Sequence, residues 1–177
     1  DEWKKACNET LGQPTSLGVD NKLIHSKIRS ALGDSAEPWV LIGGPPCQAY
    51  SLAGRARNAN SKKYVAKEDD RHFLYKEYLE IIKKFRPTVF VMENVKGILS
   101  SKPTGEPIFE KILNDLKHPS NVDFSYEIFS LSNKPNEINL FDTTYKPKDF
   151  IIKAEDYGIP QSRHRVILVG VLKDIKV

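Results

Sequence analysis

The chain has 177 residues, 40% of them hydrophobic and 28% charged, which suits one domain with a sizeable core and excludes a disordered polypeptide. Its formal net charge of +4 is compatible with a polyanionic partner but does not indicate one. Two cysteines without a Cys-x-x-Cys pair exclude a disulfide framework and a zinc ribbon. Because no long apolar run occurs, we expect no membrane span or signal peptide and a soluble, cytoplasmic protein.

The first part of the chain predicts helices, a strand and a long loop. Apolar residues at helical spacing indicate helices at 1–11 and 19–32. A continuous apolar run at 39–42 predicts a buried strand, which Gly43-Gly44-Pro45-Pro46 ends in a sharp turn. The segment 49–70 is basic and too poor in apolar residues to pack, so we interpret it as a loop that is either functional or disordered.

The second part alternates strands with helices. The patterns predict helices at 72–85 and 106–116, strands at 88–92, 126–131 and 165–172, a polar loop at 132–148 and a short apolar segment at 151–154. Such alternation predicts an α/β domain with a mainly parallel sheet and flanking helices. Ligands bind at the carboxyl ends of the strands in such sheets.

Three motifs with reactive side chains lie at strand ends. They are Gly-Gly-Pro-Pro-Cys-Gln-Ala-Tyr-Ser at 43–51, Glu-Asn-Val at 93–95 and Gln-Ser-Arg-His-Arg at 161–165. Together they would gather a thiol, a carboxyl group and two guanidiniums along one edge of the sheet. We interpret Asn94 as a brace for the turn after its strand.

Cys47 follows a turn stiffened by two prolines, which would expose its sulfur to a cleft. Guanidiniums close to the sulfur would favour the reactive thiolate. The alternative is a structural cysteine buried in a tight turn, since free cysteine is among the most buried residue types.

Glu93 follows a buried apolar run, so its surroundings can be apolar and can keep the carboxyl group protonated near neutral pH. A surface or helix-capping acid is the alternative. Arg163 and Arg165 alternate, so both point the same way if the segment is extended. They either hold a phosphate or a base oxygen, or form an ion pair at the entrance of a strand.

In this order and at these separations, the three motifs resemble the catalytic motifs of the cytosine-5 DNA methyltransferases, the modification enzymes of bacterial restriction systems included. The resemblance runs from Trp39 to Val171, and Asp-Tyr-Gly-Ile-Pro at 156–160 fits the lead-in to the last motif. It implies a partial Rossmann-like class I S-adenosylmethionine-dependent methyltransferase fold that lacks the first strands.

The resemblance also implies a mechanism. The thiolate of Cys47 would add to carbon 6 of a flipped-out cytosine, so that carbon 5 can attack the methyl group of S-adenosylmethionine. Glu93 would bond ring nitrogen 3 and Arg165 the ring carbonyl oxygen, with Arg163 in the same catalytic set. Pro45 and Pro46 would line the cofactor pocket.

Further expectations concern DNA and partners. The segment 49–70 would be a mobile catalytic loop in which Ser51, Arg55 and Arg57 contact phosphates, and Gln161 would contact DNA as well. Gln48 would either contact DNA or hold the loop closed. Double-stranded DNA is the expected partner of a monomer, with a cognate restriction endonuclease acting on the same site. No histidine pair has a metal-ligand spacing, so no metal is expected.

The chain departs from the family pattern in several places. The Phe-x-Gly-x-Gly cofactor loop, the acidic residue after the second strand, the target-recognition region and the last two motifs are absent from these residues. We therefore expect 1–177 to be a single partial catalytic domain that enters the fold after its first two strands. Alone, it should bind S-adenosylmethionine weakly or not at all, and it should lack sequence specificity.

Three other functions remain open at this point. A transfer-RNA cytosine-5 methyltransferase would use the same fold and motifs. A catalytically inactive nucleic-acid-binding module would use the basic loop to bind phosphate. A thiol hydrolase would pair Cys47 with His72 or His164, but it would leave Glu93 and the two arginines without a role.

Overall fold

The computed structural model describes residues 1–5, 15–34, 37–45, 75–102, 105–119, 124–132 and 145–173. The chain divides into two units, 1–37 and 38–177. In the first, residues 2–5 are helical, and α2 (Asn21–Leu32) lies within the helix predicted at 19–32. Gly33, with a φ of 60°, follows its last residue. The second unit contains the sheet and is described below.

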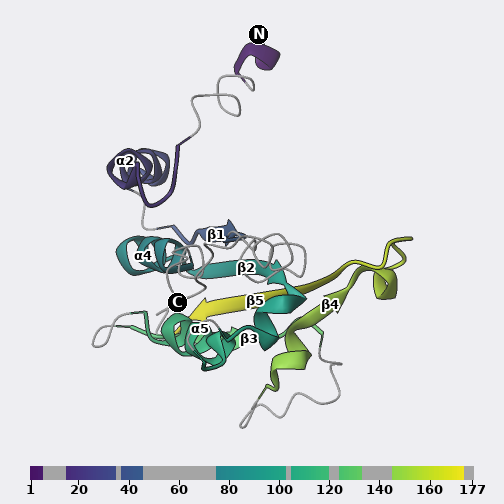
Figure 1. Ribbon diagram of the computed structural model, residues 1–177. Helices are drawn as coiled ribbons and strands as arrows, with labels where there is room; N and C mark the ends of the chain where they lie inside the picture. Colours follow the sequence, from purple (N-terminus) through teal and green to yellow (C-terminus); the bar gives the residue numbers. More distant parts are fainter. Residues whose placement is uncertain are drawn as a thin grey trace, which may run out of the picture. The chain divides into compact units, whose positions relative to one another are not determined.

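Five strands form one sheet (Figure 1): β1 (Val40–Gly43), β2 (Val89–Val95), β3 (Tyr126–Phe129), β4 (Ile151–Lys153) and β5 (His164–Leu172). The order is β1-β2-β5-β3, and β4 pairs with β5. β1 and β2 are parallel, whereas β5 is antiparallel to β2, β3 and β4. The predicted α/β class is confirmed, and a single reversed strand, β5, makes the sheet mixed.

The reversal of β5 brings its first residues beside the last residues of β2. Arg165 is opposite Val95, and Ile167 is opposite Glu93. The start of β5 therefore lies at the same edge of the sheet as the carboxyl ends of β1 and β2. In a fully parallel sheet, a residue at the start of a strand would lie at the opposite edge.

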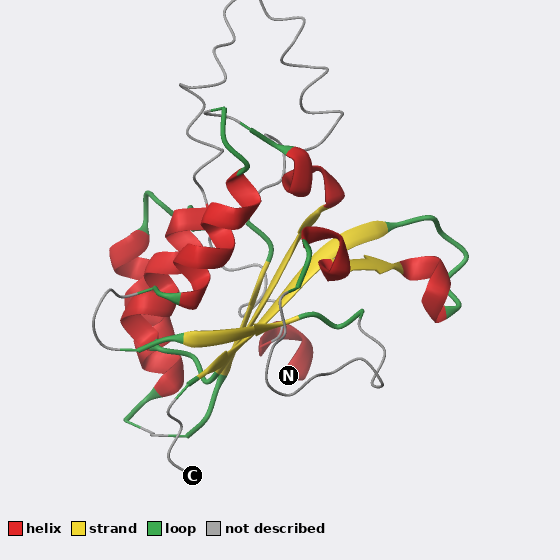
Figure 2. Ribbon diagram, turned by 90° about the horizontal axis from the view of Figure 1, so that it is seen from below, coloured by secondary structure: helices red, strands yellow, loops and turns green. Residues whose placement is uncertain are grey.

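Helices α4 (Tyr75–Phe85) and α5 (Ile108–Lys117) cover one face of the sheet (Figure 2). Alternate residues of the strands are buried against them, which makes a core that includes Phe90, Met92, Tyr126, Ile128, Val166 and Leu168. On the other face, Val40 and Ile42 are exposed. No helix described in residues 38–173 lies over that second face.

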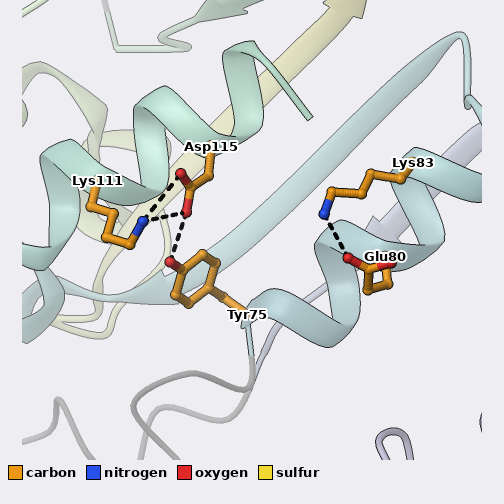
Figure 3. A network of polar contacts seen from close by, with 5 residues as sticks. All are labelled: Tyr75, Glu80, Lys83, Lys111 and Asp115. Atoms are coloured by element: carbon orange, nitrogen blue, oxygen red, sulfur yellow. Dashed lines mark hydrogen bonds and ion pairs between the residues drawn. The ribbon is translucent and has the colours of Figure 1, made fainter. Parts of the chain in front are cut away.

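A polar contact joins the two covering helices (Figure 3). The hydroxyl of Tyr75, the first residue of α4, donates to Oδ2 of Asp115 over 2.8 Å, and Lys111 lies 3.2 Å from the same oxygen. Tyr75 is 2% exposed, so its hydroxyl needs a partner inside the protein. Lys83 and Glu80 form a separate ion pair on the surface of α4.

The strand boundaries differ from the predictions in one important place. β2 continues to Val95, three residues past its predicted end, because β5 pairs with it along this whole length. Three short 3₁₀ helices were not predicted: η3 (Lys96–Ser100), η5 (Pro147–Phe150) and η6 (Ala154–Tyr157). The predicted loop 49–70 lies outside the described residues. Within the described ranges, no helix is long and apolar enough to span a membrane.

Candidate active site

Glu93 and Arg165 form an ion pair at the edge of the sheet. Nε of Arg165 lies 2.8 Å from Oε1 of Glu93, and the two side chains are 26% and 44% exposed. The register of β2 and β5 places both residues on the face that α4 and α5 leave uncovered. A ligand at this edge could therefore reach the carboxylate and the guanidinium together.

The ion pair corrects one expectation and confirms another. Glu93 does not leave the sheet into apolar surroundings, because β2 continues past it and a guanidinium lies against its carboxyl group. The prediction of an apolar environment for Glu93 is thus wrong. The alternative offered for the arginines, an ion pair at a strand entrance, is confirmed for Arg165, and its partner is Glu93, another candidate catalytic residue.

The glycine turn after β1 contacts the same carboxyl group. A Cβ atom at Gly44 would lie 3.1 Å from Oε2 of Glu93, a distance tighter than ordinary packing. The missing side chain therefore allows the backbone of the turn to approach Glu93 closely. The first motif, at 43–51, thus approaches the second, at 93–95, at Gly44 and Glu93.

Asn94 forms a second link between β2 and that turn. Its side chain is 3% exposed, and its Nδ2 donates to the carbonyl oxygen of Pro45 over 3.3 Å. Its Oδ1 accepts from the backbone N–H of Val95 over 2.9 Å. Asn94 thus braces the turn after β1. The signal for this in the sequence is the alternation of Phe90, Met92 and Asn94, which puts a polar side chain on the core face.

The hydroxyl of Tyr78 links β1 and β2 near the turn that follows β1. Its hydroxyl lies 3.3 Å from the carbonyl oxygen of Leu41 and 3.1 Å from that of Val91. Burial raises the pKa of Tyr78 above its usual range, so the phenol keeps its proton and donates. A Cβ atom at Gly43 would lie 2.6 Å from its ring, so this position requires glycine.

The third motif lies on a hairpin between β4 and β5 that projects beyond the end of β2 (Figure 1). Gln161 and Arg163 are exposed in the turn before β5. The backbone N–H of Arg163 donates to the carbonyl oxygen of Gln161 over 2.8 Å, and its own carbonyl accepts from Ala154 over 3.1 Å. Arg165 contacts Glu93, whereas Arg163 lies in this exposed turn.

Several predicted site residues lie outside the described residues: Pro46, Cys47, Gln48, Ser51, Arg55 and Arg57. Pro45 is described and is buried. The part of the chain that the structure describes contains no group of three or more metal-ligating side chains.

A groove elsewhere on the protein is separate from this edge. It has a volume of about 220 Å³ and lies between α4 and α5, with Lys76, Lys83 and His118 in its wall. These helices cover the opposite face of the sheet from Glu93, so the groove does not belong to the candidate site.

The comparisons with known proteins agree with the geometry. The family model described as C-5 cytosine-specific DNA methylase matches residues 1–177. The Type II methyltransferase M.Bpa9945I of Bacillus paralicheniformis is 33% identical over 97% of this chain and 34% of its own length. The Type II methyltransferase M.MthTI of Methanothermobacter thermautotrophicus is 30% identical over 100% of this chain and 42% of its own length.

Among solved structures, a prophage-encoded candidate DNA modification methyltransferase of E. coli superposes with a TM-score of 0.50 at 23% identity. It covers 89% of this chain and 34% of its own length, and this likeness concerns the fold alone. The chain thus spans only 34% and 42% of the length of these two curated relatives.

Proposed function

Because the chain belongs to the C-5 cytosine-specific DNA methylase family, we propose that its protein transfers a methyl group from S-adenosylmethionine to carbon 5 of cytosine in DNA. The Glu93–Arg165 ion pair, open to solvent at the edge where all three motifs converge, is the observation that carries this proposal. Cytosine presents a ring nitrogen beside a carbonyl oxygen, and a neighbouring carboxyl group and guanidinium match these two atoms.

In the proposed reaction, Cys47 is the nucleophile. Its thiolate forms a bond to carbon 6 of the flipped-out base, and the ring electrons move towards carbon 5. In its protonated form Glu93 donates a hydrogen bond to ring nitrogen 3, and Arg165 donates one to the ring carbonyl oxygen, so both stabilise the charge that the addition creates. Carbon 5 then bonds to the methyl group of S-adenosylmethionine as the bond between that methyl group and sulfur breaks. Loss of the carbon 5 proton to solvent and departure of the Cys47 thiolate complete the reaction. Arg163, exposed in the turn two residues before Arg165, would hold a phosphate of the DNA strand.

The described residues do not by themselves form a site for S-adenosylmethionine. Pro45, one of the two prolines assigned to it, is buried, and its carbonyl oxygen already accepts the N–H of Asn94. Pro45 can serve as an apolar wall only. The proposed steps therefore concern activation of the base, and S-adenosylmethionine enters as the methyl donor of the family.

The relatives named Type II methyltransferases support duplex DNA over transfer RNA as the substrate. We accordingly propose that the protein acts as a cytoplasmic monomer beside a restriction endonuclease that cuts the same sequence. The proposed contacts to DNA come from the segment 49–70, which contains Ser51, Arg55 and Arg57, together with Gln48 and with Gln161 on the hairpin.

Methyl transfer tests the proposal directly. The protein carrying this chain is incubated with tritiated S-adenosylmethionine and either duplex DNA or transfer RNA. The expected result is incorporation into DNA, abolished by Cys47→Ser. Incorporation into transfer RNA alone would show that transfer RNA, and not DNA, is the substrate. Incorporation into neither would overturn the proposed function.

A further inference from the structure

A histidine and a glutamate close the hairpin that carries the third motif. Nε2 of His164, the first residue of β5, lies 2.5 Å from Oε1 of Glu155 in η6. The proposed reaction assigns no role to either side chain. Both are partly exposed, at 29% and 39%, and they lie at the edge of the sheet that carries the candidate site.

A backbone hydrogen bond and an ion pair connect His164 to the candidate catalytic pair. The backbone carbonyl oxygen of His164 accepts a hydrogen bond from Nη1 of Arg165 over 2.8 Å. Nε of the same guanidinium lies 2.8 Å from Oε1 of Glu93. The conformation of His164 therefore determines where one end of the Arg165 guanidinium is held.

The backbone of the hairpin reinforces this connection. Lys153 pairs with His164 across β4 and β5, and the N–H of Ala154 donates to the carbonyl oxygen of Arg163 over 3.1 Å. Glu155 follows directly, so its bond to His164 closes a small ring of contacts around the start of β5. This ring fixes the residue that precedes Arg165.

The charges of the hairpin favour this contact. The hydrogen bond from His164 is the largest cause that lowers the pKa of Glu155, and the nearby Lys153 ammonium also lowers it. The carboxylate form of Glu155, which can accept the hydrogen bond, is thereby favoured.

We propose that Glu155 and His164 are positioning residues for Arg165, holding the start of β5 so that the guanidinium is aimed at Glu93 and at the bound cytosine. This inference rests on the proposed function of the Glu93–Arg165 pair. An exposed ion pair adds little to stability, so the proposal predicts a loss of reaction rate without a matching loss of stability.

Two amide substitutions at His164 distinguish a positioning role of its side chain from a general effect of replacing the histidine. The Nε2 atom of glutamine stands as many bonds from Cα as the imidazole Nε2, whereas the amide nitrogen of asparagine is one bond shorter. His164→Gln can therefore keep the contact with Glu155, and His164→Asn cannot. Glu155→Ala removes the partner, and Asp156→Ala is the matched control on the same 3₁₀ helix.

The readout is the rate at which the protein, with S-adenosylmethionine present, forms a covalent adduct with duplex DNA containing 5-fluorocytosine. DNA affinity is measured beside it. His164→Asn and Glu155→Ala should each slow the adduct about 10-fold, with DNA affinity and Tm nearly unchanged. His164→Gln and Asp156→Ala should form the adduct at a rate within about twofold of the unsubstituted protein. The double variant His164→Asn with Glu155→Ala should be no slower than either single variant. Multiplying effects, or an unchanged rate in His164→Asn, would overturn the inference.

A second measurement keeps this test independent of the proposed function. The Nε–H proton of Arg165 is followed by NMR in the protein that carries this chain. Its solvent exchange should be slow in the unsubstituted protein and in His164→Gln but faster in His164→Asn. Equal exchange in all three would overturn the inference. A missing DNA adduct together with the expected exchange pattern would overturn the proposed function alone.

Discussion

The side-chain amide of Asn94 donates a hydrogen bond to the backbone carbonyl of Pro45 and so ties β2 to the turn that ends β1. Cys47 follows Pro45 by two residues, with only Pro46 between them. Because proline fixes its own φ angle, the chain between Pro45 and Cys47 has fewer free backbone dihedral angles than an ordinary segment of this length. Asn94 therefore links the strand that carries Glu93 to the segment that carries the proposed nucleophile.

Replacing Asn94 with alanine should destabilise the fold. The change leaves the buried carbonyl oxygen of Pro45 and the part-buried N–H of Val95 without their side-chain partner. We expect a loss of about 1–3 kcal/mol in the free energy of unfolding, measured by urea titration. Asn114→Ala on the exposed side of α5 is the control. A loss for Asn94→Ala no larger than that of the control would contradict this role.

Glu93→Gln should stop the chemistry while leaving DNA binding intact. The amide keeps the volume of the side chain but removes the charge that pairs with Arg165 and changes what nitrogen 3 of cytosine meets. We expect adduct formation on DNA to slow by about 100-fold or more, with DNA affinity within about threefold.

The matched control for Glu93 is Glu127→Gln. Glu127 lies on β3, on the same face of the sheet, opposite Val171 of β5. It is exposed, and it belongs to none of the three motifs. Equal slowing by the two substitutions would show that charge on this face, and not the position of Glu93, governs the rate.

Tyr75→Phe should weaken the packing of α4 on α5. The substitution deletes only the hydroxyl that donates to Asp115, and the remaining carboxyl group loses a partner (Figure 3). The expected cost is about 1–2 kcal/mol in chemical unfolding. Glu80→Gln, which breaks the exposed ion pair with Lys83, should cost less than about 0.5 kcal/mol. A larger loss of unfolding free energy for Glu80→Gln than for Tyr75→Phe would refute the role given to the Tyr75–Asp115 hydrogen bond.

The pH dependence of Glu155 follows from its lowered pKa. Its folded value lies below the 4.5 of the free side chain, mainly because His164 bonds to its carboxylate. Its stabilising contribution is therefore present above pH 4.5 and is lost as the pH falls through the folded pKa. Carboxyl carbon NMR should give a titration midpoint below 4.5 that moves back towards 4.5 in His164→Asn. A midpoint at or above that value would disprove the contact.

The sequence predicted those features that depend on local periodicity. The helical spacing of Ile108, Phe109, Ile112 and Leu116 placed α5 within two residues of its observed bounds, and the apolar runs located β1 and β5. The 3₁₀ helix η6 was missed because a four-residue polar segment has too little periodicity to be recognised.

The candidate site needed information that is not local. The motifs predicted that a carboxyl group and guanidiniums would share one edge, but the contact between Glu93 and Arg165 depends on the direction and register of β5 against β2. Alternation along a strand states which residues share a face, but it does not state which neighbour the strand has or which way that neighbour runs. The same limit led to the expectation of an apolar environment for Glu93.

The measurement that tests the central claim most directly is a covalent adduct on a denaturing gel. The protein carrying this chain is mixed with S-adenosylmethionine and duplex DNA containing 5-fluorocytosine, because fluorine at carbon 5 blocks the proton loss that releases the enzyme. Cys47→Ser is the control, with unsubstituted duplex DNA in a parallel lane. The account predicts a band of protein joined to DNA that requires both Cys47 and the fluorinated base. The absence of that band, or its persistence in Cys47→Ser, would contradict the account.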